Sequence, residues 1–72
     1  MEMIPITNSS QIAAIGWQDE TLHIRFIRGE TYSYANVRNS LFQELLNAPS
    51  IGKVFQARIK NHPELYPHTK QP

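Results

Sequence analysis

The hydrophobic pattern of this chain changes its period halfway along, and that change limits the folds that the chain can adopt. Leu22, Ile24 and Phe26 occupy alternate positions, as in a strand with one buried face. After residue 39 the apolar residues recur at helical spacing, for example at Leu41 and Leu45. Strands followed by helices predict an α+β fold in which the two kinds of element are segregated.

The first half of the chain contains three runs that read as strands. They cover residues 11–18, 21–27 and 31–37, with polar residues at the first turn and Gly29 at the second. A tight hairpin needs a residue that tolerates a positive φ, and glycine does so without steric cost. The sequence therefore predicts a three-stranded antiparallel meander.

Two helices are predicted to follow and to pack on one face of that sheet. Ser40 with Gln43 three residues later is typical of a capping box at the start of the first helix. Pro49 breaks the chain, and Ser50 stands where it can cap the second helix. Pro63 should end that helix. The predicted core residues are Trp17, Ile24, Phe26, Leu45, Phe55 and Ile59.

The ends of the chain are expected to lie outside the meander. Residues 1–9 can add a fourth strand, which Pro5 would confine to the sheet edge. We expect one domain over residues 6–66 and a disordered tail over residues 67–72.

Size and composition exclude several classes of protein. The chain has 72 residues, no cysteine and a net charge of +1. A domain this short has a small core, so self-association into a homo-oligomer stays open. No apolar run approaches the roughly 20 residues that span a bilayer, and the first residues lack the features of a secretory signal. The expected location is the cytoplasm, without a membrane partner.

The residues that usually carry catalysis are scattered. The acidic residues fall in turns or on exposed helix positions, and there is no thiol nucleophile. His23, His62 and His68 do not have the spacing of metal ligands. We expect neither an enzyme nor a bound metal or cofactor.

Several short motifs together resemble a known family. They are Ser9-Ser10-Gln11-Ile12, Ile15-Gly16-Trp17, Tyr32-Ser33-Tyr34, Ser50-x-Gly52, Phe55 and Ile59. Their order and spacing resemble the KTSC domain, which is named for its occurrence at the C-terminus of some lysyl-tRNA synthetases. The family also occurs as short stand-alone proteins in bacteria and their phages.

The resemblance covers roughly residues 6–66 and implies an RNA-binding role, which the synthetase context suggests for the family. Trp17 stands where the family usually has tyrosine, and Arg38 stands where a proline often starts the helix. A role in tRNA charging is not implied, because no synthetase body is present.

The environment of Tyr32 and Tyr34 depends on the length of the preceding hairpin loop. Strand alternation places both on one face of the sheet. A two-residue loop at Arg28–Gly29 would set Tyr32 opposite Arg25 and Tyr34 opposite His23. The result would be a cationic aromatic platform for RNA bases.

A three-residue loop over residues 27–29 would shift the pairing by one residue. Tyr32 and Tyr34 would then oppose Ile24 and Leu22 and help to build the core. Arg28–Gly29 is not the Asn-Gly pair that favours the short loop, so we favour core or half-buried tyrosines.

The predicted second helix carries most of the positive charge. Lys53 and Lys60 share a helix face, and Arg58 lies further round. This face could contact a nucleic-acid backbone, or it could simply keep the helix soluble. Ser50 and Gly52 at the helix start form a candidate anion site beside Lys53, although a serine cap and close packing explain the same residues.

Together these observations favour a non-enzymatic module that binds RNA. The residues expected to bind are Tyr32, Tyr34, Arg25, Lys53, Arg58 and Lys60. The alternative is a protein-interaction or inhibitor module of phage or mobile-element type, which occupies a host protein or sequesters a small nucleotide. That alternative would use apolar surface at Ile12, Ile27 and Trp17.

Overall fold

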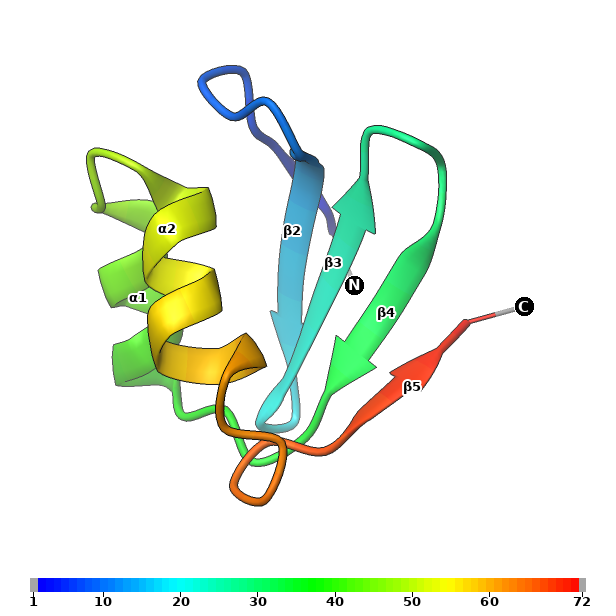
Figure 1. Ribbon diagram of the computed structural model, residues 1–72, viewed down its shortest axis with the longest axis vertical. Coiled ribbons are helices and arrows are strands. Elements are labelled where there is room, and N and C mark those ends of the chain that lie inside the picture. Colours follow the sequence, from blue (N-terminus) through cyan, green and yellow to red (C-terminus); the bar gives the residue numbers. More distant parts are fainter. Residues whose placement is uncertain (1, 72) are drawn as a thin grey trace.

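Five antiparallel strands form one sheet in chain order, and two helices cover one of its faces (Figure 1). The structure is a computed structural model, and it describes residues 2–71. The predicted α+β fold, with helices packed on one face of an antiparallel sheet, is confirmed. In chain order the elements are β1 (Ile4–Pro5), β2 (Ile12–Gln18), β3 (Thr21–Phe26), β4 (Thr31–Tyr34), α1 (Asn39–Leu46), α2 (Ile51–Phe55), the π-helical stretch η1 (Gln56–Lys60) and β5 (His68–Lys70).

The hairpin between β3 and β4 has the three-residue loop. The backbone N–H of Phe26 donates to the carbonyl oxygen of Glu30 at 2.8 Å, so residues 27–29 form the loop. Gly29 has a φ of 102°, a conformation that side chains other than glycine's adopt only with strain. The short loop that would have produced an exposed platform is therefore excluded.

The loop length decides which face the tyrosines occupy. Tyr32 lies opposite Ile24, and Tyr34 lies opposite Leu22. Leu22 and Ile24 are fully buried beneath the helices. Both tyrosines consequently face the helix side of the sheet, as the three-residue loop predicts.

The helix starts differ from the predicted capping. The first helix has Arg38 at its N-cap, and the N–H groups of Leu41 and Phe42 donate to the Arg38 carbonyl oxygen. Ser40 lies inside the first turn, so the predicted capping box is wrong. Ser50 does occupy the N-cap of α2, but its hydroxyl makes no capping hydrogen bond.

The C-terminal segment is part of the sheet, so the predicted disordered tail over residues 67–72 is wrong for its described residues. β5 pairs with β4, with Tyr34 opposite His68 and Tyr32 opposite Lys70. The Ala35 N–H donates to the Pro67 carbonyl oxygen at 3.0 Å. Without β5, the outer edge of β4 would present unpaired backbone groups, and β5 satisfies them.

At the other edge, β1 pairs with β2, which confirms the expected fourth N-terminal strand. The core lies between β2, β3, β4 and the helices. Ile12 is fully buried, so it cannot supply the exposed apolar surface that the interaction alternative requires. Trp17 and Phe26 are only partly buried. The other predicted core residues are buried: Ile24, Leu45, Phe55 and Ile59.

No helix within residues 2–71 has both the length and the apolar character needed to cross a bilayer.

Candidate functional site

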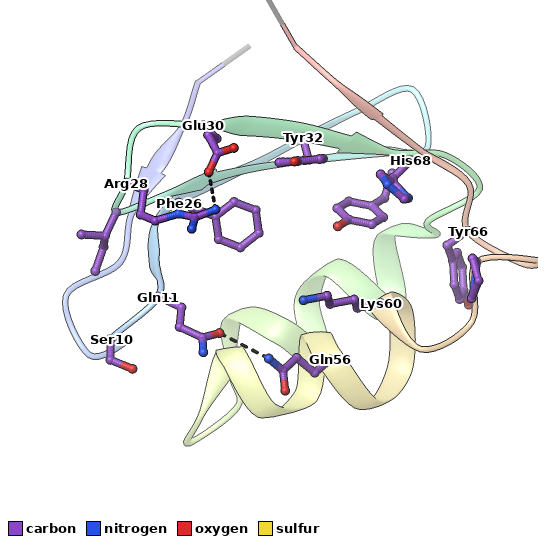
Figure 2. Close-up of a pocket in the computed structure, with 13 residues that line it drawn as sticks. Ser10, Gln11, Phe26, Arg28, Glu30, Tyr32, Gln56, Lys60, Tyr66 and His68 are labelled. Carbon is purple, nitrogen blue, oxygen red and sulfur yellow. Dashed lines mark hydrogen bonds and ion pairs between the residues drawn. The ribbon is translucent and has the colours of Figure 1, made fainter.

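A groove opens between the sheet and the second helix (Figure 2). One wall is the helix-facing side of β3, β4 and β5, and the other is formed by η1 and the chain before β2. Its volume is about 680 Å³, which lies in the range of sites that hold small organic ligands. The groove is therefore the leading candidate for a binding site.

Aromatic rings line the sheet wall of the groove. The ring of Tyr32 lies between Phe26, whose centroid is 5.8 Å away at an interplanar angle of 78°, and His68, at 5.7 Å. The His68 ring also lies 5.5 Å from that of Tyr34. Tyr66 stands at one end of the groove (Figure 2). Such a wall offers flat apolar surfaces against which another planar group can stack.

Tyr34 anchors this wall to the core. Only 5% of its surface is exposed, and its ring packs edge-on against Phe55 with centroids 5.1 Å apart. Burial raises the pKa of the Tyr34 phenol above its ordinary value, and the neighbouring Tyr32 acts in the same direction. Tyr34 is thus a fixed neutral side chain, whereas Tyr32 is only partly buried and open to a ligand.

Lys60 supplies positive charge from the helix wall. Its side chain lies in the groove and runs along the helix wall (Figure 2). Throughout residues 2–71, the ion pairs of the structure do not include Lys60. Its ammonium group can therefore meet an anionic ligand without first breaking an ion pair.

Glu30 is the acidic residue of the groove. Its carboxylate accepts a hydrogen bond of 2.6 Å from the Arg28 guanidinium, and Lys70 Nζ lies 3.5 Å from its second oxygen. The hydrogen bond and charge of Arg28 lower the pKa of the Glu30 carboxyl, and Lys70 lowers it further. Glu30 is therefore an ionised group that accepts hydrogen bonds and donates none.

The predicted binding residues separate into two groups. Tyr32, Tyr34 and Lys60 line the groove together. Arg25 alternates with Ile24 along β3, so it is exposed on the opposite face of the sheet. The predicted platform of Arg25 with both tyrosines is therefore wrong, because a three-residue loop puts them on different faces.

The other cations of the second helix also lie outside the groove. Arg58 pairs with Glu44 on α1 at 2.5 Å. Lys53 is exposed and does not line the groove. The positive charge of this helix thus does not form one surface with the tyrosines.

The candidate anion site at Ser50 and Gly52 is also separate from the groove. A Cβ added at Gly52 would lie 3.7 Å from the Ser9 hydroxyl oxygen, an ordinary contact, so packing does not require glycine there. The Ser9 hydroxyl accepts hydrogen bonds from the N–H groups of Gln11 and Ile12, and so caps the turn before β2.

The groove residues that were not predicted to bind include Phe26, Glu30, Tyr66 and His68. Phe26 and Glu30 could have been found, because the alternation of each strand puts them on the face of the tyrosines once the loop length is fixed. His68 carried no such signal, because only the pairing of β5 with β4 brings it there, and Tyr66 lies in the turn just before that strand.

The open face of the sheet carries a small polar network. The Ser33 hydroxyl lies 2.9 Å from His23 Nδ1 and accepts a hydrogen bond of 2.6 Å from the Gln71 side chain. Within the described residues 2–71, no three His, Asp or Glu side chains gather as a metal site would require.

Comparisons with known proteins agree with this architecture. The KTSC domain family model matches residues 8–62 of the chain. The crystal structure of a KTSC domain protein from Yersinia pestis superposes with a TM-score of 0.85 at 31% sequence identity, and the match covers 99% of this chain and 97% of that one. Comparison with curated proteins gives no significant match.

Proposed function

The chain belongs to the KTSC family, and from that premise we propose that it is a non-enzymatic module that binds single-stranded RNA in the groove between the sheet and η1. The observation that carries this proposal is an aromatic wall facing a lysine that has no partner among the ion pairs of residues 2–71. The bases of RNA are planar rings and its phosphate backbone is negatively charged, so RNA matches both walls of the groove.

Tyr32 is the residue that would stack a base. Its ring is partly exposed and held between Phe26 and His68, so it loses little conformational freedom on binding. Stacking of a base on an aromatic side chain is worth roughly 1–3 kcal/mol. One or two such contacts would give weak binding that increases when several copies of the domain act together.

Lys60 would meet a phosphate. It reaches in from η1, whereas Arg28 at the hairpin is already paired with Glu30. Because only a few cations take part, we propose a modest salt dependence, with a slope of about one per phosphate contact. This differs from the broad basic face that the sequence suggested for the second helix.

The interaction alternative has less support from the surface. Ile27 and Leu65 are 58% and 55% exposed, but Ile12 is buried and Trp17 packs against the core. An apolar partner would need a contiguous patch of apolar surface. If the chain instead bound a protein through apolar surface, that affinity would persist at high salt.

The test is fluorescence anisotropy with a labelled single-stranded RNA octamer of mixed sequence at low and moderate salt. We expect weak, salt-sensitive binding by the unmodified chain. Tyr32→Ala and Lys60→Glu should each lower the affinity by about tenfold, as loss of a stacking or phosphate contact would.

Lys53→Glu is the matched control, because it makes the same charge change on the same helix outside the groove. Its affinity should stay within about twofold of the unmodified chain, since screening weakens distant charges. Equal weakening by Lys53→Glu and Lys60→Glu would rule out the groove as the site. Absence of any binding at low salt would overturn the proposal.

A further inference from the structure

Glu30 is an unexpected residue in a groove that otherwise suits an anionic ligand. It stands at the hairpin end of the groove, with its carboxylate beside the Phe26 ring (Figure 2). Strand alternation places it on the same face as Tyr32, two residues further along the chain. A base that stacks on Tyr32 would therefore direct one edge toward this carboxylate.

Two cations hold that carboxylate in place. Arg28 donates to one oxygen at 2.6 Å, and Lys70 lies 3.5 Å from the other, so one partner comes from the hairpin and one from β5. A carboxylate has about four acceptor positions on its two oxygens. Each oxygen therefore keeps a free position, which a ligand can use if it brings two donors side by side.

Among the four RNA bases, guanine has that arrangement. Its Watson–Crick edge carries the N1–H and the 2-amino group next to each other, and both are donors. Adenine and cytosine place one amino donor next to an acceptor nitrogen, and uracil places one N–H between two carbonyls. An ionised carboxylate accepts but cannot donate, so it pairs well only with the guanine edge.

We propose that the groove selects a guanine base, which stacks on Tyr32 and directs its N1–H and 2-amino group to Glu30. The proposal deepens the proposed function and rests on it, since it assumes that the groove holds a nucleotide base. Guanine can come from a free nucleotide or from single-stranded RNA, and the chemistry at Glu30 is the same.

The same charges set the direction of the ligand. A phosphate beside Glu30 would compete with its carboxylate for Arg28 and Lys70, whereas Lys60 on the opposite wall has no partner among the ion pairs of residues 2–71. The base accordingly lies toward the hairpin and the phosphate toward η1.

The first experiment compares nucleoside monophosphates on the unmodified chain by NMR titration of its backbone amides. We expect GMP to bind about tenfold more tightly than AMP, CMP or UMP, as a bidentate contact to a base allows. IMP is the matched ligand, because it keeps the guanine ring but lacks the 2-amino group. Its affinity should fall about fivefold below that of GMP.

The variant Glu30→Gln tests the residue. It keeps the size of the side chain but exchanges one acceptor oxygen for a donor, so GMP should lose its advantage over AMP while both still bind. Glu44→Gln is the control, because it makes the same change to a carboxylate on α1 that does not line the groove. It should keep the preference for GMP.

The outcomes separate this proposal from the one it rests on. Equal affinity of the unmodified chain for GMP, IMP and AMP would overturn guanine selection and leave RNA binding intact. Retention of the GMP preference by Glu30→Gln would also overturn it. A failure of every mononucleotide and of the RNA octamer to bind would overturn the proposed function itself. Tighter binding of UUUGUU than of UUUUUU or GMP would identify RNA as the source of the base.

Discussion

The indole nitrogen of Trp17 donates a hydrogen bond of 2.7 Å to the backbone carbonyl oxygen of Val37, which lies 20 residues further along the chain. The Trp17 ring also stacks on Phe42 of α1, with centroids 6.3 Å apart. A single side chain at the end of β2 thus holds the segment that leads from the sheet into the helices.

Replacing Trp17 with phenylalanine should destabilise the domain. The variant keeps an aromatic ring beside Phe42 but leaves the part-buried Val37 carbonyl without its donor, at a cost of roughly 1–3 kcal/mol. The free energy of unfolding is measured by urea unfolding followed by far-ultraviolet circular dichroism. Tryptophan fluorescence cannot be used, because the substitution removes the chain's one tryptophan. Trp17→Leu should cost more, since it also removes the ring. An unchanged free energy of unfolding in Trp17→Phe would show that the hydrogen bond contributes nothing.

Two glycines should respond in opposite ways to alanine. Gly29→Ala should cost about 1–3 kcal/mol, because alanine at a φ of 102° is strained even though space is available. Gly52→Ala should be neutral or stabilise by up to about 1 kcal/mol, since Gly52 lies in α2 and an added Cβ meets only an ordinary contact. Thermal unfolding of the two variants checks this pair. Equal stability would contradict the assignment of the three-residue loop.

The free energy of unfolding should fall with rising pH in the range where tyrosine titrates. The pKa of Tyr34 is raised by burial, so the folded chain keeps its proton at pH values where the unfolded chain has lost it. Unfolding then releases a proton, and stability declines as the pH rises above about 10. Below that pH the contribution is complete.

Tyr34→Phe isolates this effect. Unfolding in urea at about pH 8 and about pH 11 should show a larger loss of stability in the unmodified chain than in the variant. The lysines and the remaining tyrosines titrate in both proteins, so their contributions to the pH dependence cancel in the comparison. Parallel pH profiles would show that Tyr34 ionises as freely in the folded chain as in the unfolded one.

The C-terminal strand should protect specific amides from hydrogen exchange. The Gln71 N–H donates to the Thr31 carbonyl oxygen at 2.8 Å, and the Ala35 N–H donates to that of Pro67 at 3.0 Å. Both amides should exchange much more slowly than in an unfolded chain. Ending the chain after Tyr66 should remove the protection of Ala35. Free exchange at Gln71 in the full chain would instead support a disordered tail.

The candidate site was only partly accessible from the sequence. Tyr32, Tyr34 and Lys60 do share one groove, as three of the six predicted binding residues. Arg25, Lys53 and Arg58 do not, because sequence spacing gives the face of a single strand or helix but not which faces meet. Arg58, for example, forms an ion pair with Glu44 of the other helix, α1.

Local patterns predicted β2, β3, β4 and the helices, and favoured the three-residue loop that puts the tyrosines on the helix side of the sheet. These features depend on residues a few positions apart, whose periods of two and 3.6 can be read directly. Tertiary structure alone decided that His68 joins Tyr32 and that Lys70 faces Glu30. β5 pairs with a strand more than 30 residues earlier, and its three exposed residues carry no hydrophobic alternation. Backbone hydrogen bonds to the open edge of β4 place it, and those bonds are available to any sequence without proline at the donor positions.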